Sequence, residues 1–166
     1  MKTGFVFPAH GGCGLVNRVI PDIESDHFIE KIRENKVYRI SNADLSTFYR
    51  IADGMLSPLE GPMGEKEFYR VLDEEVIERN NKLYAWTIPL AFLISREESE
   101  KYFAGETVVV MNEHGKIVGA LEITDIYPLD KARYNKAVYG SDRKDHPGPR
   151  IVNEDPRDFL LGGKIW

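Results

Sequence analysis

A glycine-rich segment near the beginning of the chain contains residue types that could bind an anion. Residues 11–14, Gly-Gly-Cys-Gly, follow Pro8 and His10. Clustered backbone amides can cradle a phosphate. The segment lacks the Gly-Lys-Ser/Thr ending of a P-loop and the strand–loop–helix setting of a dinucleotide-binding fingerprint. We therefore predict a structural arm here, with an anion site as the alternative.

His10 and Cys13 could also act as metal ligands, or Cys13 as a nucleophile. Their spacing suits half of a zinc site, but the chain has a single cysteine and four scattered histidines. A nucleophilic Cys13 would need a neighbouring base and a positive setting, and the sequence shows neither. We assign no metal ligand and no catalytic cysteine.

His146 is the next candidate, because a histidine beside carboxylates can act as a general base. Asp142 and Asp145 precede it, and Pro147-Gly148 follows. The alternative is a tight polar turn in which His146 caps backbone groups. We favour the turn.

Residues 131–150 alternate basic side chains with Tyr134 and Tyr139, a pattern that could bind RNA or a phosphorylated ligand. The basic residues are Lys131, Arg133, Lys136, Arg143, Lys144 and Arg150. Acidic residues in the same stretch weaken the positive field. The net charge of −5 weighs against a dedicated nucleic-acid binder. We predict a solvated helix and loop, with RNA binding as the alternative.

The composition is that of a soluble globular protein. The chain has 166 residues, of which 42% are hydrophobic and 30% charged, so we expect one compact domain without wholesale disorder. A single cysteine permits no internal disulfide and suits a reducing compartment. The longest nearly apolar run, 84–94, is too short to span a bilayer, and no signal peptide is evident. We expect a cytoplasmic protein without membrane contact.

Residues 44–64 are predicted to form a helix followed by a proline-locked loop, and they organise the rest of the chain. The apolar positions expected on one helical face are Leu45, Phe48, Ala52 and Met55. Ser41 can cap the start of the helix, and Gly54 stands where its end needs a positive φ. The loop at 57–64 contains two prolines, so it cannot be helical. Because it is apolar, it must pack on its own core or on another domain.

Helices and strands alternate through the remaining sequence. We expect further helices at 25–32, 65–75, 97–103 and 131–139, with Phe68, Val71 and Leu72 inward in the second of these. We expect strands at 37–40, 86–93, 107–111 and 116–126, and short strands near Ile151 and Lys164. The clearest local prediction is the hairpin whose loop is 112–115, Asn-Glu-His-Gly. Short strands with decorating helices indicate an α+β fold built on a small twisted barrel.

A series of motifs, in order along nearly the whole chain, resembles the N-terminal domain of bacterial and archaeal sulfate adenylyltransferase (ATP sulfurylase). The motifs lie at 8–18, 44–64, 86–90, 123–127, 130–131, 138–140, 146–148 and 161–163. The most specific is Ile-Ala-Asp-Gly…Ser-Pro-Leu…Gly…Met at 51–63. Three departures do not break the pattern: Cys13-Gly14 lengthens the glycine arm, Asp53 replaces a small or amide residue, and Pro62 replaces an aromatic one.

The resemblance implies a PUA-like pseudo β-barrel with decorating helices, formed by one domain over 1–166 in which 1–24 are an irregular arm. In this family the complete enzyme joins sulfate to the α-phosphate of ATP and releases pyrophosphate and adenylyl sulfate. The resemblance implies that ATP and magnesium are used only by the complete enzyme.

The family's catalytic motifs, Gln-x-Arg-Asn, His-x-x-His and Gly-Arg-Asp-His, belong to a following nucleotidyltransferase domain and have no counterpart here. The chain has no glutamine, and Arg157-Asp158 is followed by Phe159. The histidines, which form no His-x-x-His, are His10, His27, His114 and His146. We therefore assign no catalytic, cofactor-binding or metal-binding residue to this chain.

The sequence thus predicts an accessory domain that is inactive alone and docks on a sulfate adenylyltransferase catalytic domain in cis or in trans, with a homo-oligomer as a further option. The segments at 8–15, 56–64 and 159–166 are apolar and are expected to provide the docking surface, the last leading into a further domain. The alternative is a free-standing PUA-like RNA-binding module. An autonomous hydrolase using His146 is the weakest hypothesis.

Overall fold

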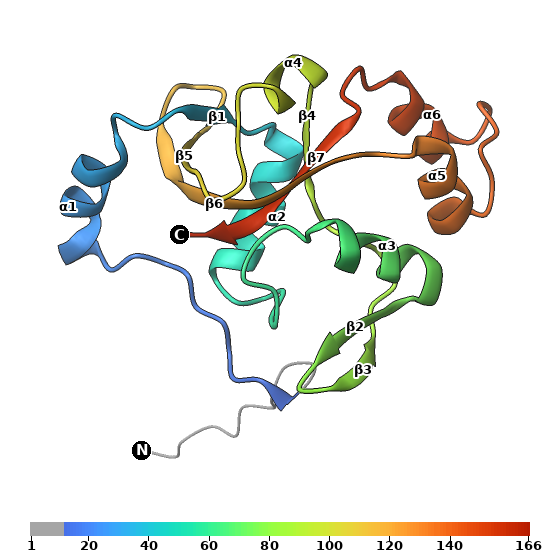
Figure 1. Cartoon of the computed structure of the whole chain (residues 1–166), viewed down its shortest axis with the longest axis horizontal. Helices are drawn as coiled ribbons and strands as arrows, with labels where there is room; N and C mark the ends of the chain where they lie inside the picture. Colours follow the sequence, from blue (N-terminus) through green and yellow to red (C-terminus); the bar gives the residue numbers. More distant parts are fainter. Residues whose placement is uncertain (1–11) are drawn as a thin grey trace.

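A curled sheet of five strands lies at the centre of the fold in the computed structural model, which describes residues 12–166 (Figure 1). The strand order is β1-β5-β6-β7-β4. β1 runs parallel to β5, and every other neighbouring pair is antiparallel. The strands are β1 (Val37–Arg39), β4 (Phe92–Ile94), β5 (Thr107–Met111), β6 (Ile117–Pro128) and β7 (Phe159–Ile165). A separate hairpin consists of β2 (Val76–Arg79) and β3 (Lys82–Ala85).

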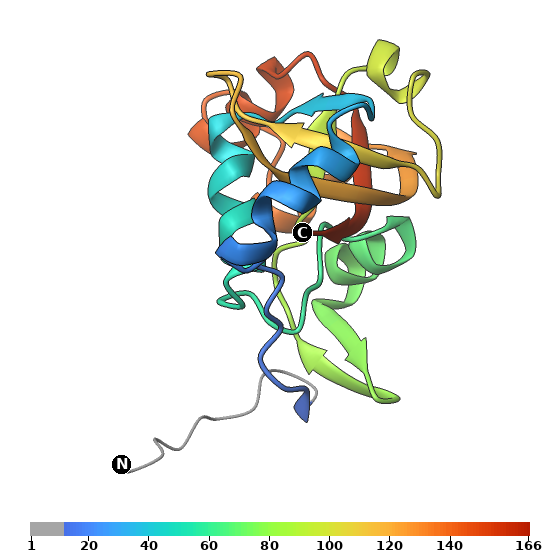
Figure 2. The same cartoon turned by 90° about the vertical axis from the view of Figure 1, so that its left-hand side faces the viewer.

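Helices decorate this sheet, as expected for an α+β pseudo-barrel. They are α1 (Asp22–Ile32), α2 (Asn42–Ala52), α3 (Glu65–Glu74), α4 (Arg96–Ser99), α5 (Lys131–Tyr139) and α6 (Pro147–Glu154). In Figure 2 α1 lies across the outside of the sheet, and its Ile32 packs with Val109 of β5 and Ala120 of β6. No helix within residues 12–166 has the length and apolar character needed to cross a membrane.

The long strand β6 gives the sheet its curvature. It has 12 residues; its first half pairs with β5, and pairing with β7 continues to its end. Its register shifts between Ile123 and Asp125 on the β7 side, and such bulges bend a strand and increase its twist. The β5–β6 hairpin is confirmed: Asn112 Oδ1 accepts from the amides of His114 and Lys116 at 3.0 and 2.9 Å.

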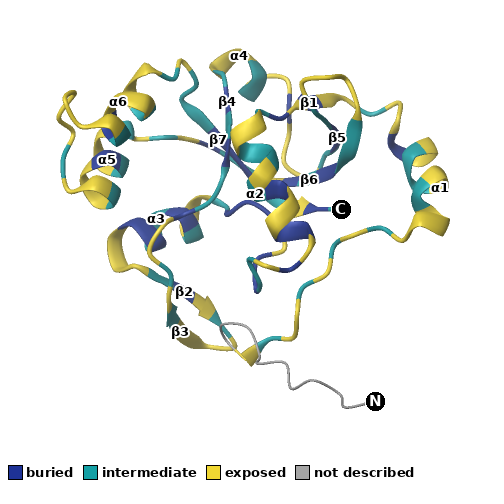
Figure 3. Ribbon diagram, turned by 180° about the vertical axis from the view of Figure 1, so that it is seen from behind, coloured by how far each residue is buried: buried dark blue, intermediate teal, exposed yellow. Residues whose placement is uncertain are grey.

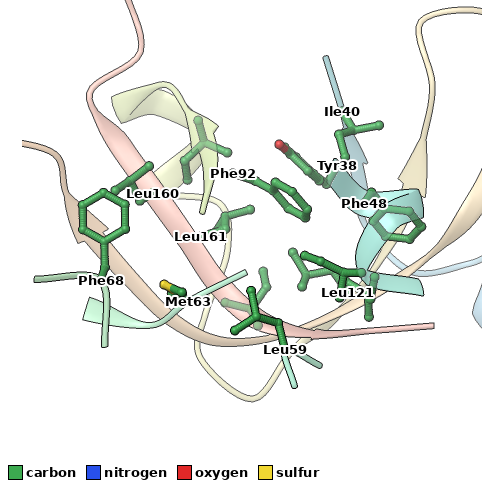
Figure 4. Packing of buried hydrophobic residues seen from close by; sticks show 14 of the residues in the cluster. Tyr38, Ile40, Phe48, Leu59, Met63, Phe68, Phe92, Leu121, Leu160 and Leu161 are labelled. Carbon is green, nitrogen blue, oxygen red and sulfur yellow. The ribbon is translucent and has the colours of Figure 1, made fainter. Parts of the chain in front are cut away.

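The main core lies between α2, α3 and the concave side of the sheet. In Figure 4 the side chains of Tyr38, Phe48, Phe92 and Leu161 converge from four different elements. The rings of Tyr38 and Phe48 each lie 6.3 Å from that of Phe92. Figure 3 shows the same distribution, with buried residues along the central strands and exposed residues on the outer helical faces.

Helix α2 confirms the predicted helix, with one error in its buried face. Ser41 Oγ accepts from the amide of Asp44 at 3.2 Å, so the predicted cap is present. Phe48 and Ala52 are buried, as is Ile51, which the spacing argument omitted. The helix ends at Ala52, so Met55 lies beyond its last turn and is 68% exposed, contrary to the prediction. Gly54 has the expected positive φ of 83°.

The strand predicted at 86–93 is wrong for most of its length. Only Phe92–Ile94 forms a strand, β4, which pairs with β7. Pro89 has no amide hydrogen to donate, which disfavours a ladder through this segment. The β2–β3 hairpin was not predicted; its turn places Asn80 and Asn81 at φ values of 54° and 59°, a conformation that asparagine tolerates.

Three helices also differ from prediction. The helix expected at 97–103 is the shorter α4, which ends at Ser99. The strand expected near Ile151 is instead part of α6, where Pro147 suits the first helical turn. α1 begins at Asp22 after Pro21, three residues before the expected cap at Ser25. The predicted helix at 65–75 is confirmed as α3, whose Phe68, Val71 and Leu72 are buried.

Candidate functional site

The proline loop, residues 56–64, packs on the chain's own core. Leu59 and Met63 are each only 1% exposed. The loop also runs beside β7, because the carbonyls of Glu60 and Pro62 accept from the amides of Ile165 and Gly163 at 3.0 and 2.9 Å. The expectation that this loop supplies much exposed docking surface is therefore wrong.

The apolar segment at 159–166 is likewise part of this fold. Phe159–Ile165 form β7, which lies between β6 and β4. The backbone of Trp166 exchanges hydrogen bonds of 3.1 and 2.8 Å with that of Ala120. These residues therefore form a strand of this sheet, and the expectation that 165–166 lead into a further domain stays a prediction.

The arm, residues 12–20, is attached to α2 and β7 by hydrogen bonds. Figure 1 shows it running from near the β2–β3 hairpin to α1. The Val16 amide donates to Ser57 Oγ at 2.9 Å. The Arg18 amide donates to the Ala52 carbonyl at 2.9 Å, and Arg18 Nε donates to the Ile165 carbonyl at 2.8 Å. These bonds give the arm one defined path across the fold.

The guanidinium group of Arg18 is only partly hydrogen-bonded within its own domain. Its guanidinium carbon lies 4.4 Å from the centre of the Trp166 ring, a cation–π contact. Its Nη2 atom is buried and has no hydrogen-bond partner among the residues that the structure describes. A buried donor without an acceptor is costly, so an additional group that supplied an acceptor here would stabilise the arrangement.

A groove of about 220 Å³ separates the arm and α1 from α2 and β6. Its lining includes Arg18, Val19, Phe28, Phe48, Ile117 and Trp166. Val19, which lines it, is 56% exposed, and Leu15, which lies against Gly54, and Met55 are 66% and 68% exposed. We call these three residues, with Arg18 and Trp166, the docking face. Exposed apolar surface of this kind is typical of an interaction site.

His146 forms the predicted polar turn. It precedes α6, and its Nδ1 accepts from the amide of Gly148 at 3.2 Å. Neither predicted carboxylate partner is hydrogen-bonded to it, and Asp145 instead binds Arg143 at 2.6 Å. The geometry therefore contains no carboxylate–histidine pair at this position.

Three of the six basic side chains at 131–150, those of Lys131, Arg133 and Arg143, are engaged within the protein. Arg133 binds Asp73 at 2.5 Å and lies over the ring of Tyr69, and Lys131 Nζ donates to the carbonyl of Asp155. Tyr134 stacks on Phe68 at 6.3 Å, and burial raises its pKa to about 12. These contacts engage half of the predicted cations and the Tyr134 ring, which weakens the case for RNA binding.

Cys13 is half-buried and lies 3.8 Å from Asn80 Nδ2 at the β2–β3 turn. His10 and Gly11, on which the zinc and anion hypotheses partly depended, lie outside the described residues. From Gly12 onward, no group of three or more His, Cys, Asp or Glu side chains could hold a metal ion.

The pairing of Arg18 with Trp166 was not predicted from the sequence. Both residues lie in segments singled out for other reasons, but Arg18 and its acceptor Ile165 are 147 positions apart. No local spacing signal can indicate such a contact.

Comparison with known proteins gives one consistent result. A family model described as a PUA-like domain matches residues 7–166. A sulfate adenylyltransferase of Pyropia yezoensis is 43% identical over 161 residues, which cover 96% of this chain and 37% of that protein. A sulfate adenylyltransferase of Halothermothrix orenii is 32% identical, covering 94% of this chain and 40% of that protein. The chain therefore spans well under half of these relatives, in their N-terminal portion.

A solved structure has a similar fold. The hexameric APS kinase from Thiobacillus denitrificans superposes with a TM-score of 0.68 over 97% of this chain and 26% of that chain. The sequence identity is 15%, so the likeness concerns the fold alone.

Proposed function

The chain belongs to the PUA-like domain family, and on that premise we propose that it is the N-terminal accessory domain of a sulfate adenylyltransferase. In this proposal residues 1–166 form a single domain. The domain docks on a catalytic portion, in cis or in trans, and helps to shape it. The catalytic portion, together with ATP and magnesium, converts ATP and sulfate to adenylyl sulfate and pyrophosphate. We propose a cytoplasmic location, which the single cysteine supports.

The difference in coverage carries this proposal. The match extends over 96% of this chain but over 37% of the Pyropia yezoensis relative. The larger part of that relative therefore has no counterpart here. Adenylyl transfer needs cationic and hydrogen-bonding groups around the reacting phosphate. Three of the six basic residues that the sequence suggested for phosphate binding are instead paired with acceptors of their own domain.

The docking face supplies the structural support. Leu15, Val19 and Met55 are exposed apolar residues, and Val19 lines the groove. The unpaired Nη2 of Arg18 lies beside the same groove. A partner that covered this face with apolar side chains and one hydrogen-bond acceptor would bury the exposed apolar surface and pair Arg18 Nη2.

An activity assay tests the catalytic part of the proposal. We expect the isolated chain to form no adenylyl sulfate from ATP, sulfate and magnesium above a control without protein. Turnover that depended on this chain, and that mutations in it abolished, would place an active site here.

A binding assay tests the docking part. The chain is mixed with the separately produced catalytic portion of a similar sulfate adenylyltransferase, and complex formation is followed by light scattering over a concentration series. We expect a complex that Val19→Asp and Met55→Asp weaken. Phe103→Asp is the matched control, because Phe103 is 64% exposed and lies outside the docking face.

Three results would contradict docking through this face. One is a monomer that ignores the catalytic portion. Another is equal loss of binding in all three variants. A third is self-association that the same face variants abolish, which would assign the face to a second copy of the chain.

A further inference from the structure

A second cleft, of about 230 Å³, lies between α2, the segment before β4, and helices α5 and α6. Its apolar walls include Ile88, Leu90, Leu129, Tyr134, Val152 and Leu160. Ile88 and Ile151 line the cleft and are 49% and 67% exposed, so they form an apolar rim at its opening. Concave apolar cavities with a few polar groups are the usual form of small-molecule sites.

Asp44 is a polar group of this cleft with unused hydrogen-bonding capacity. Its Oδ2 accepts from the Ser41 hydroxyl at 2.8 Å and lies 3.7 Å from Arg157 Nη1. Its Oδ1 accepts no hydrogen bond from any part of the chain between Gly12 and Trp166. Burial raises the pKa of Asp44, the effect expected where the charged form is incompletely compensated.

Arg157, which lies near Asp44, and Lys131, which lines the cleft, are already bound to other groups. Arg157 binds both oxygens of Asp155, with contacts of 2.9 and 2.7 Å, and Lys131 donates to the Asp155 carbonyl. Arg157 makes only the longer 3.7 Å approach to Asp44. A ligand cation would therefore meet a carboxylate oxygen that is free to accept, whereas a ligand carboxylate would be repelled by it.

We propose that this cleft binds a compact apolar molecule that ends in a protonated amine. The ammonium group donates to Asp44 Oδ1, with the Thr47 hydroxyl as an additional lining group. The apolar part lies between the walls and is covered by Ile88 and Ile151. The volume suits a molecule smaller than a typical drug, since sites for those are roughly 300–1,000 Å³.

Three probes of matched shape test the proposal: 3-methylbutylamine, 3-methylbutanol and 4-methylpentanoate. Each is titrated at neutral pH into the isotope-labelled chain, and amide chemical shifts are followed by NMR. We expect the amine to shift the amides at 44–47, 88–91 and 151–155. We expect it to bind roughly tenfold more tightly than the alcohol, because charge-assisted hydrogen bonds are about twice as strong as neutral ones. We expect no binding of the carboxylate.

Substitutions then locate the site. Asp44→Asn keeps an acceptor for Ser41 but removes the charge, so the amine should lose about its tenfold advantage over the alcohol. Asp53→Asn makes the same charge change after the end of α2, outside the cleft, and should have no effect. Ile151→Trp alters the exposed rim and should block both the amine and the alcohol.

The proposal is overturned if the amine and alcohol bind equally, or if the shifts map to another surface. It is also overturned if Asp44→Asn and Asp53→Asn behave alike. If Asp44→Asn disturbs folding, seen in its own spectrum, the probe preference in the unmodified chain and the Ile151→Trp result still decide the question.

Discussion

Asp44 and Asp155 both lie near Arg157, but their pKa values are shifted in opposite directions. The hydrogen bond from Arg157 lowers the pKa of Asp155 below its ordinary value. Burial raises the pKa of Asp44, against the opposing effects of the Ser41 hydrogen bond and the charge of Arg157. Asp155 adds to the rise through its own negative charge. Arg157 binds Asp155 through two hydrogen bonds and approaches Asp44 only at 3.7 Å, so it does not offset the burial of Asp44.

The two aspartates should therefore affect the pH dependence of stability in opposite directions. The folded state holds the proton of Asp44 more tightly than the unfolded chain does. Ionising Asp44 consequently reduces stability as the pH rises from about 4 through its raised folded-state pKa. The lowered pKa of Asp155 adds stability above about pH 4 that is lost as the pH falls through the folded-state value.

We expect Asp44→Asn to be at least as stable as the unmodified protein at neutral pH and to lose that advantage in acid. We expect Asp155→Asn to cost about 1–2 kcal/mol at neutral pH, because it weakens charge-assisted hydrogen bonds, and less in acid. Urea unfolding between pH 3 and 7 measures both differences. If the change in unfolding free energy relative to the unmodified protein varied with pH in the same way for both variants, the opposite pKa shifts would be refuted.

At the scale of elements, α2 is the helix that joins the core to the arm. Phe48 is 1% exposed and contacts the Phe92 ring, whereas Met55, after the helix end, is 68% exposed. Phe48→Ala should cost roughly 3–5 kcal/mol of unfolding free energy, as expected for a buried aromatic. Met55→Ala and Arg50→Ala should each cost within about 0.5 kcal/mol. Denaturant melts of the three variants measure the free energies of unfolding. Similar losses for all three would mean that the buried face of α2 is assigned incorrectly.

The close approach of the proline loop to β7 depends on glycine. A Cβ atom on Gly61 would overlap the carbonyl oxygen of Gly163, whereas a Cβ on Gly14 in the arm would meet no atom within 4 Å. Gly61→Ala should therefore cost about 1–3 kcal/mol, the usual range for overpacking. Gly14→Ala is the matched control and should change stability by no more than about 0.5 kcal/mol. Thermal melts of both variants suffice, and equal midpoints would mean that the loop lies further from β7.

For the molecule as a whole, charge distribution decides between an accessory domain and an RNA-binding module. The chain carries a net charge of −5, and Arg133 and Arg143 are paired with Asp73 and Asp145. Binding dominated by phosphate contacts weakens steeply with added salt. We expect at most weak binding to structured RNA, erased at about physiological salt, in a filter or fluorescence assay. Submicromolar binding that persisted there and disappeared in Arg143→Glu/Lys144→Glu would favour the RNA alternative.

Much of this fold could be predicted from short-range patterns. The cap by Ser41, the Asn112 turn and the inward face of α3 each depend on residues within about one helical turn or one hairpin. Side-chain spacing and turn chemistry act at this range, so these features can be predicted from the local sequence. The ordered series of motifs also indicated the PUA-like family, which residues 7–166 match.

Only the tertiary structure decided where the ambiguous apolar segments pack. The proline loop could have packed on another domain, but it pairs with Gly163 of β7, and Trp166 pairs with Ala120 in the same sheet. The contacts of Arg18 with Ile165 and Trp166, and the cleft at Asp44, arise in the same way. Such arrangements depend on which distant surfaces meet when the sheet closes. The hydrophobic effect is non-directional and stabilises many pairings of apolar segments almost equally. Which pairing forms is therefore decided by the packing of the whole folded molecule.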